Sequence, residues 1–158
     1  MSIVIRTMKK GDIDAVHEIE TLSFRTPWTK AALRSELTNT VAHYLVLVED
    51  GCVLGYCGMW VMFDEAHVTN LAIHPHIRGR GLSKALLFRS MEWAEELGAN
   101  AMTLEVRETN HIAQRLYEGF GFVQQGLRKG YYEDTGENAL LLWNRDIEDT
   151  LAVRDEQT

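Results

Sequence analysis

The sequence predicts an α/β (α+β) protein with a mixed, mostly antiparallel central sheet of about seven strands, flanked by about four helices. Segments with strand-like apolar patterns alternate with segments of helical periodicity, in the order β-α-α-β-β-β-α-β-α-β-β. This order combines hairpins, which pair strands antiparallel, with crossover helices, which connect parallel strands. We therefore expect helices on both faces of one mixed sheet.

The N-terminal region is expected to form a strand and two helices. A strand over residues 2–8 precedes a helix whose apolar stripe consists of Ile13, Val16, Ile19 and Leu22. The segment 25–29 contains a proline and interrupts that helix, and Thr29 can cap a second, short helix that ends before Asn39.

Three strands are then predicted in succession. An apolar run over 44–49 and a second run over 52–62 flank Asp50-Gly51, which is typical of a tight hairpin turn. Gly55 and Gly58 within the second run indicate bulges or a close approach of another group. A further strand is expected over residues 65–74.

The remaining chain predicts a long helix, a strand, a short helix and two closing strands, over residues 81–97, 101–106, 110–120, 122–131 and 139–145. The buried stripe of the long helix is expected to contain Leu82, Leu86, Trp93 and Leu97. Because the sequence contains no repeat or linker, we expect one domain over residues 1–146, followed by a flexible acidic tail over 147–158.

Composition limits the possible functions. The 158 residues suit one domain, and 46% apolar with 25% charged residues is ordinary globular usage. The N-terminus has no apolar segment long enough for a signal peptide or a membrane span, so we expect a cytoplasmic protein without a membrane partner. Cys52 and Cys57 are expected to be reduced, and the net charge of −7 argues against general nucleic-acid binding.

A basic, glycine-containing turn lies between the strand at 65–74 and the long helix. Arg78, Arg80 and Lys84 flank two glycines there, where helix N–H groups and the helix dipole favour an anion. A polyanionic cofactor such as a pyrophosphate is one interpretation, and an ordinary turn with solvated arginines is the other. The turn lacks the Gly-Lys-Ser/Thr ending of a P-loop and the third glycine of the dinucleotide motif.

The segment Arg78-x-x-Gly81-x-Ser83 resembles the acetyl-CoA pyrophosphate loop of the GNAT superfamily, in which Arg or Gln precedes a spaced pair of small residues. Ser83 stands where the family usually has Gly or Ala. The resemblance covers about residues 1–145: 68–75 resemble the splayed cofactor strand, and 110–122 resemble a second signature. It implies acetyl-CoA as co-substrate, no metal, and cofactor contacts from Leu71, Ala72, Ile73, Arg78, Gly79, Arg80, Gly81, Leu82, Ser83, Lys84, Asn110, Ala113 and Tyr117.

Acyl transfer from a thioester to an amine needs a base, donors for the oxyanion and an acid for the departing thiolate. Glu105 lies in an apolar strand, where a carboxylate is costly unless it has a task or reaches solvent at the strand end. The segment 104–110 resembles that of N-terminal acetyltransferases, which implies that Glu105 is the general base. The same resemblance implies that Tyr117 is the general acid, although a tyrosine on a helix commonly serves packing alone.

The aromatic residues Phe24, Trp28, Tyr131 and Tyr132 are similar to the walls of the peptide groove in bacterial ribosomal-protein-alanine N-acetyltransferases. The resemblance implies the N-terminal amine of a small-subunit ribosomal protein as acceptor. An α-amine, with a pKa of about 8, is partly neutral at cellular pH, whereas lysine has a pKa of about 10.4. A monomer or a weak dimer is expected.

Other functions remain open from the sequence. One is acetylation of a small amine such as a polyamine or an aminoglycoside, which needs the cofactor loop but not the peptide groove. The other is a non-catalytic acetyl-CoA-binding module, against which the presence of both Glu105 and Tyr117 argues. A metal enzyme is not expected, because His74 and His76 have no third ligand at usable spacing.

Overall fold

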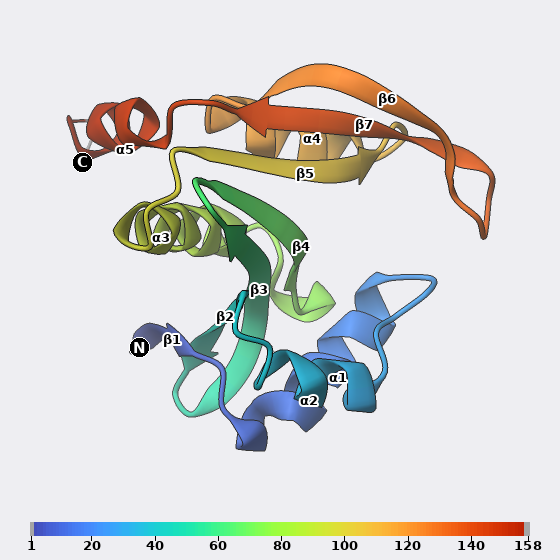
Figure 1. Ribbon diagram of the computed structural model, residues 1–158. Coiled ribbons are helices and arrows are strands. Elements are labelled where there is room, and N and C mark those ends of the chain that lie inside the picture. The colour runs from blue at the N-terminus through green and yellow to red at the C-terminus, as the bar shows by residue number, and fades with distance from the viewer. Residues whose placement is uncertain (1, 157–158) are drawn as a thin grey trace. The chain divides into compact units, whose positions relative to one another are not determined.

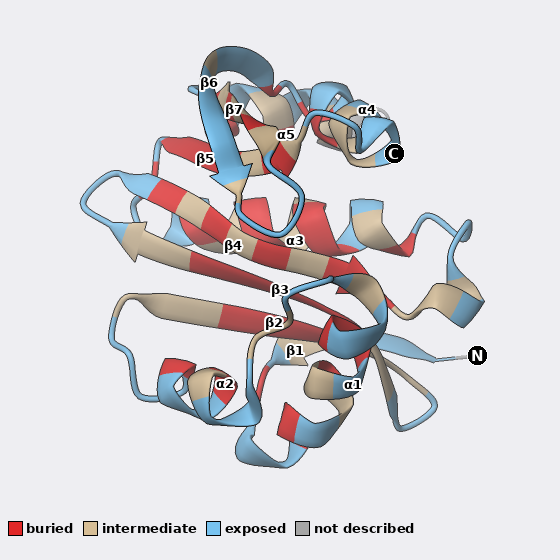
Figure 2. Cartoon of the chain, turned by 90° about the vertical axis from the view of Figure 1, so that its right-hand side faces the viewer, coloured by how far each residue is buried: buried red, intermediate tan, exposed pale blue. Residues whose placement is uncertain are grey.

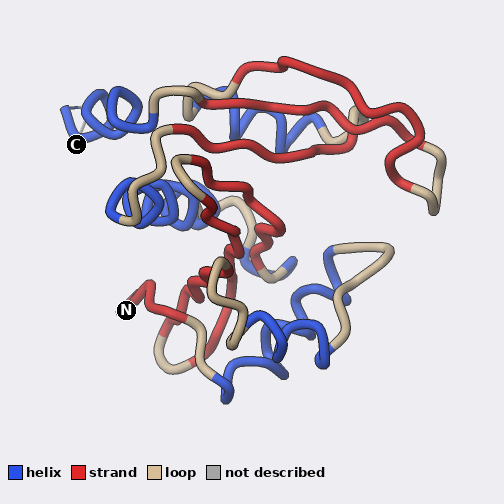
Figure 3. Tube along the Cα trace, viewed as in Figure 1, coloured by secondary structure: helices blue, strands red, loops and turns tan. Residues whose placement is uncertain are grey.

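The computed structural model describes residues 2–156 of the chain (Figure 1). Within these residues the strands form one seven-stranded sheet in the hydrogen-bonding order β1-β2-β3-β4-β5-β7-β6. The pairing of β4 with β5 is parallel, and the pairings of β1 with β2, β2 with β3, β5 with β7 and β6 with β7 are antiparallel. The predicted fold class is therefore confirmed. Figure 3 shows the alternation of helices and strands along the chain.

The chain divides into two compact units, one of Met1–Val61 with Val68–Ser90 and one of Met62–His67 with Met91–Thr158. The first unit contains β1 (Ile3–Thr7), a 3₁₀ turn (Lys10–Asp12), α1 (Ile13–Ser23), α2 (Lys30–Glu36), β2 (Ala42–Glu49) and β3 (Cys52–Met62) up to residue 61. It also holds the end of β4 (Glu65–Ile73), a 3₁₀ turn (Pro75–Ile77) and the start of α3 (Leu82–Glu96).

The hairpin of β2 and β3 forms as the sequence predicts. Asp50 and Gly51 at its turn have φ angles of 50° and 84°, the left-handed conformation that two-residue hairpin turns require. Helices α1 and α2 contribute Ile13, Val16, Ile19 and Leu33 to the core of this unit, together with Met8, Tyr44, Val46, Tyr56 and Ala72. Figure 2 shows buried positions along β2, β3 and β4.

Three expected stripe residues are not buried: Trp93 on α3 is half-buried, and two others are exposed. Leu22 on α1 is 51% exposed, and Leu97, which follows the end of α3 at Glu96, is 40% exposed. Helix α3 instead buries Leu87, Met91 and Ala94 beside Leu82 and Leu86. A helix ends its buried stripe where its chain turns away, and Gly98, with a φ of 95°, makes that turn after α3.

The second unit contains β5 (Ala101–Arg107), α4 (His111–Gly119), β6 (Val123–Tyr132), β7 (Glu137–Asn144) and α5 (Ile147–Glu156). The first residues of β4 pair with β5 so that His67 lies opposite Thr103. The expected flexible tail begins with α5, in which Ile147 and Leu151 are buried, so apolar burial orders this segment despite its acidic composition. Residues 157 and 158 lie outside the described part. No helix in the described part is long and apolar enough to cross a membrane.

Candidate active site

The basic turn after β4 has the backbone of an anion site. Gly79 and Gly81 have φ angles of 88° and 74°, and an added Cβ at either position would meet nothing within 4 Å. Glycine adopts this conformation without strain, and it leaves the backbone open to a close ligand. The first α-helical hydrogen bond of α3 runs from the Ala85 N–H to the Gly81 carbonyl, at 3.3 Å. The N–H groups of the first turn therefore point towards the turn, with the positive end of the helix dipole.

The basic side chains of the turn differ in their partners. Arg80 donates two hydrogen bonds to Glu49 on β2, at 3.0 and 2.6 Å, and this pairing raises the pKa of Arg80 and lowers that of Glu49. The Arg78 guanidinium lies 3.4 Å from the Ile73 carbonyl oxygen. Lys84, on the first turn of α3, is exposed. The carboxylate of Glu49 therefore neutralises Arg80, while Lys84 adds positive charge at the helix start.

The strand predicted to bind the cofactor is closely packed at its end. Ala72 and Ile73 are buried, and Leu71 is half-buried. A Cβ at Gly55 on β3 would lie 2.5 Å from Ile73 Cδ1, and one at Gly58 would lie 2.5 Å from the Tyr44 ring. These two glycines mark the close approach that the sequence predicts, and the strand β4 depends on their missing side chains.

Glu105 lies on β5 in the second unit, with a side chain that is 10% exposed. Its Oε2 is 2.7 Å from Nε2 of His67, and its Oε1 is 3.7 Å from the Arg128 guanidinium. Burial raises the pKa of Glu105, but the hydrogen bond and charge of His67 and the charge of Arg128 together hold it below its usual value. Glu105 is therefore ionised near neutral pH, and an ionised carboxylate only accepts hydrogen bonds, so His67 Nε2 is the donor.

The tyrosine pair at the end of β6 lies in the same unit. The Tyr131 and Tyr132 rings are in edge contact, with centroids 5.1 Å apart and planes at 84°. Tyr131 is 45% exposed, and both burial and the charge of Glu105 raise its pKa. Burial likewise raises the pKa of Tyr132 to about 12. Both hydroxyls are therefore protonated at neutral pH and can donate hydrogen bonds.

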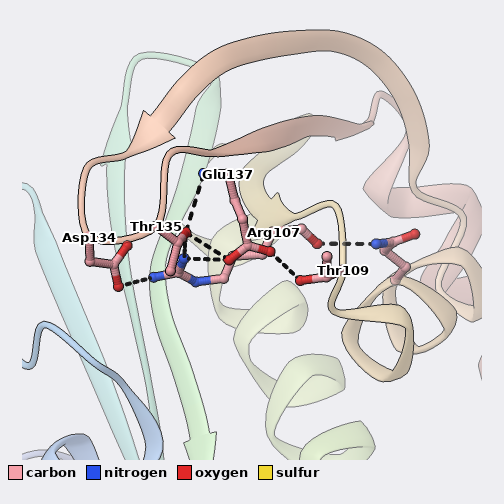
Figure 4. A network of polar contacts seen from close by, with 6 residues as sticks. Arg107, Thr109, Asp134, Thr135 and Glu137 are labelled. Atoms are coloured by element: carbon pink, nitrogen blue, oxygen red, sulfur yellow. Dashed lines mark hydrogen bonds and ion pairs between the residues drawn. The ribbon is translucent and has the colours of Figure 1, made fainter.

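A polar network fixes the turn that follows the tyrosine pair (Figure 4). Arg107 at the end of β5 donates to Asp134 at 2.8 Å, to Glu137 at 3.0 Å and to Thr135 at 3.1 Å. Its guanidinium also lies 4.0 Å from the centroid of the Tyr132 ring, within range of a cation–π interaction. Arg107 thus connects β5 to both the β6–β7 turn and the tyrosine pair.

Tyr117 and Asn110 have clear structural tasks. Tyr117 on α4 is 7% exposed, and its ring contacts Phe122 edge-on at a centroid distance of 5.5 Å. The Asn110 side chain accepts a hydrogen bond from the Ala113 N–H at 3.1 Å and so caps α4. Packing accounts for the placement of the Tyr117 ring. It does not decide whether the Tyr117 hydroxyl also acts as a general acid.

Phe24 and Trp28 lie in the loop between α1 and α2 in the first unit. Phe24 is 39% exposed and Trp28 is half-buried. The Trp28 N–H donates to Glu20 at 2.8 Å, and Thr29 caps α2 by accepting from the Ala32 N–H at 3.1 Å. The loop therefore has a defined backbone and presents aromatic surface to solvent.

Similarity to known proteins identifies the family of this chain. The family described as the acetyltransferase (GNAT) family matches residues 13–122. The chain belongs to the GNAT acetyltransferase family. GNAT enzymes take an acetyl group from acetyl-CoA, and the chain is an acetyl-CoA-dependent N-acetyltransferase.

Several GNAT relatives have similar sequences or structures. A Bacillus subtilis protein named as a candidate ribosomal protein bS18-alanine N-acetyltransferase is 48% identical over 140 residues, which cover 88% of this chain and 93% of that protein. The Haemophilus ducreyi ribosomal protein bS18-alanine N-acetyltransferase is 34% identical over 144 residues, covering 88% of this chain and 97% of the relative. The crystal structure of the Escherichia coli ribosomal-protein-S18-alanine N-acetyltransferase matches with a TM-score of 0.83 and 28% identity, over 90% of this chain and 92% of that chain.

Within this GNAT chain, the predicted residues fall into two groups. Phe24, Trp28, residues 71–73 and residues 78–84 lie in the first unit, and the second contains Glu105, Asn110, Ala113, Tyr117, Tyr131 and Tyr132. Further charged or polar residues contact members of these groups and were missed by the sequence analysis, among them Glu20, Glu49, His67, Arg107 and Arg128. Glu20 lies on the apolar face of α1, four residues after Val16, which was the available signal for it. Arg107 and Arg128 are charged strand residues, which sequence alone does not distinguish from solvated ones.

Proposed function

We propose that this GNAT enzyme acetylates the N-terminal α-amine of a protein, most specifically the N-terminal alanine of a small-subunit ribosomal protein. The names of the relatives in Bacillus subtilis and Haemophilus ducreyi support this acceptor. A ribosomal acceptor places the protein in the cytoplasm. The observation that carries the proposal is the Glu105 carboxylate, which is 10% exposed and lies 2.7 Å from His67 and 3.7 Å from Arg128, in the same unit as the tyrosine pair.

Glu105 suits an α-amine as acceptor. Its Oε1 lies 3.7 Å from the Arg128 guanidinium, and that arginine side chain is 56% exposed. A carboxylate with a lowered pKa attracts an α-ammonium group but is too weak a base to deprotonate it, because that group has a pKa of about 8; the fraction of the amine that is already neutral attacks. The carboxylate becomes a sufficient base once the nitrogen has attacked the acetyl carbonyl, because the bonded nitrogen is then strongly acidic. The proton passes to Glu105 directly or through water.

Tyr117 is the proposed general acid. A phenol has a reference pKa of about 10, so it is protonated near neutral pH and can donate to a departing thiolate. In this step the carbon–sulfur bond breaks, and the thiolate takes the phenolic proton. Tyr117 is 7% exposed, so a thiolate that reaches its hydroxyl meets the phenol in a site with little water.

The turn after β4 fits the pyrophosphate of acetyl-CoA. Its two glycines leave room for a close ligand, and the first turn of α3 supplies N–H donors with the exposed Lys84. The proposed cofactor contacts are Leu71, Ala72, Ile73, Arg78, Gly79, Arg80, Gly81, Leu82, Ser83, Lys84, Asn110, Ala113 and Tyr117. Arg80 is proposed to contribute through its backbone, because Glu49 holds its guanidinium.

The proposed acceptor contacts are Phe24 and Trp28 in the first unit, and Tyr131 and Tyr132 in the second. Aromatic side chains bind a peptide by covering its backbone with large apolar area, while each tyrosine hydroxyl also offers a hydrogen bond. Tyr131 and Phe24 support this role through their exposure, at 45% and 39%.

The test is thiol release from acetyl-CoA with three acceptors. These are an Ala-initiated peptide, the same peptide with a blocked α-amine and its lysines intact, and spermidine. Turnover on the free-amine peptide alone is expected. Turnover on the blocked peptide would show that the enzyme acetylates lysine side chains. Turnover on spermidine alone would agree with the GNAT family but would refute the proposed peptide acceptor.

A further inference from the structure

Glu20 is a buried carboxylate that the proposed chemistry does not use. It lies on α1 with 1% of its surface exposed. Its Oε2 accepts from the Trp28 N–H at 2.8 Å, and its Oε1 accepts from Asn70 Nδ2 at 3.2 Å and from the Tyr56 hydroxyl. The donors come from the α1–α2 loop, from β4 and from β3, and all are in the first unit.

The cost of burying this carboxylate is offset by these donors. An unpaired buried charge destabilises a protein strongly, whereas a carboxylate with several hydrogen-bond donors is stable in the interior. Burial, followed by the charge of Glu20, raises the pKa of Tyr56, so that hydroxyl remains a donor. Asn70 is also held in place, because its Oδ1 accepts a hydrogen bond from the Thr69 hydroxyl at 2.8 Å. The same oxygen would lie 2.5 Å from a Cβ at Gly58, so the glycine leaves room for it.

Glu20 contacts the backbone at both ends of the segment that contains the proposed acceptor residues. Its carbonyl oxygen accepts from the Phe24 N–H at 2.9 Å, while its carboxylate accepts from the Trp28 N–H at 2.8 Å. Hydrogen bonds to a charged acceptor are roughly twice as strong as neutral ones. The segment between these contacts has its ends fixed by one residue, and that residue is anchored to the sheet through Tyr56 and Asn70.

We infer that Glu20 is a positioning residue for the acceptor: by holding the Trp28 backbone, it sets the orientation of the aromatic residues that bind the peptide. The inference rests on the proposed role of Phe24 and Trp28. A purely structural role would reduce stability without discriminating between the two substrates. A positioning role acts on the acceptor selectively.

The experiment compares Glu20→Gln with Glu36→Gln. The amide of the first variant replaces one carboxylate oxygen with a donor, so either the Trp28 N–H or the donors at Oε1 lose their acceptor. Glu36 is a matched control, because it is 7% exposed in the same unit and accepts from the Trp60 indole at 3.0 Å. For Glu20→Gln we expect KM for the Ala-initiated peptide to rise about tenfold, with kcat and KM for acetyl-CoA within about twofold. Glu36→Gln should leave peptide KM within about twofold.

A second measurement tests the hydrogen bond from the Trp28 N–H to Glu20 in the absence of any acceptor substrate. Amide hydrogen exchange at the Trp28 N–H should accelerate in Glu20→Gln and stay unchanged in Glu36→Gln. If Glu20→Gln does not fold, Tyr56→Phe replaces it, because it removes one neutral donor from the same carboxylate; peptide KM should then rise about threefold.

Equal increases of peptide KM in the glutamine variants of Glu20 and Glu36 would overturn the inference. So would a Glu20→Gln variant that loses kcat or affinity for both substrates alike, or unchanged exchange at Trp28. A wild-type enzyme that is inactive on the peptide refutes the proposed function instead. The variants are then compared on the amine that the wild type acetylates, and an unchanged KM for that amine would overturn the positioning role.

Discussion

Replacing Arg107 with methionine should destabilise the second unit by a predictable amount. The change removes ion pairs to Asp134 and Glu137 and a hydrogen bond to Thr135 (Figure 4). It also removes the cation–π contact with Tyr132. The Arg107, Asp134 and Glu137 side chains are 25%, 20% and 24% exposed, so solvent screens both pairs partly. The Arg107–Asp134 pair then contributes at most about 1 kcal/mol, and the cation–π contact about 0.5–1 kcal/mol. The expected loss is about 0.5–2 kcal/mol.

Urea unfolding of the wild type and of Arg107→Met measures this loss. The two free energies of unfolding are comparable when the m-value, their slope against urea concentration, is the same in both proteins. Arg107→Lys keeps a charge but not the planar fork, so it should lose an intermediate amount. A double-mutant cycle with Tyr132→Leu should return a coupling of about 0.5–1 kcal/mol. A loss below about 0.5 kcal/mol for Arg107→Met would show that these contacts behave like ordinary surface ion pairs and would refute the reasoning.

Three further changes test other groups. Glu105→Gln should lower kcat by about 10²-fold or more while leaving acetyl-CoA binding nearly intact, because only the base is lost; wild-type kcat with both substrates saturating would remove Glu105 from the mechanism. Tyr117→Phe keeps the ring packing against Phe122 but removes the acid, so kcat should fall with little loss of stability; unchanged thiol release would contradict the acid role. Asp12 has its pKa lowered chiefly by the hydrogen bonds from Arg6, so its stabilisation is present above the unfolded pKa and lost as pH falls through the folded one. Asp12→Asn should cost about 1–3 kcal/mol at pH 7, and its difference from wild type should shrink below about pH 4 in urea unfolding.

Much of the fold follows from local sequence patterns. The Asp50-Gly51 hairpin, the Thr29 and Asn110 caps and the succession of strands and helices depend on residues close together in the chain, and each is present in the structure. The exceptions depend on tertiary packing. Leu22 continues the helical stripe but is exposed, and the acidic segment after Asp146 forms α5 because Ile147 and Leu151 are buried.

The candidate site likewise contains residues that the sequence could indicate and residues that it could not. The cofactor turn, Glu105 and Tyr117 could be selected from the sequence because each belongs to a contiguous motif, and their roles remain proposals. The partners of Glu105 could not be selected. His67 is 38 residues away, and the parallel register of β4 and β5 places it opposite Thr103. Glu105, two residues after Thr103, shares the face of the sheet on which His67 lies, because side chains alternate along a strand.

The sequence by itself determined the fold class, because periodicity is a local property, and its motifs indicated the family through their resemblance to known GNAT signatures. Only the tertiary structure decided which groups shift the pKa values of the residues in these motifs and which groups position them. Glu20 binds donors at Trp28, Tyr56 and Asn70, and Arg107 binds acceptors beyond the β6–β7 turn. Such contacts join segments far apart in the chain, and a buried carboxylate is stable only where the complete fold supplies its donors.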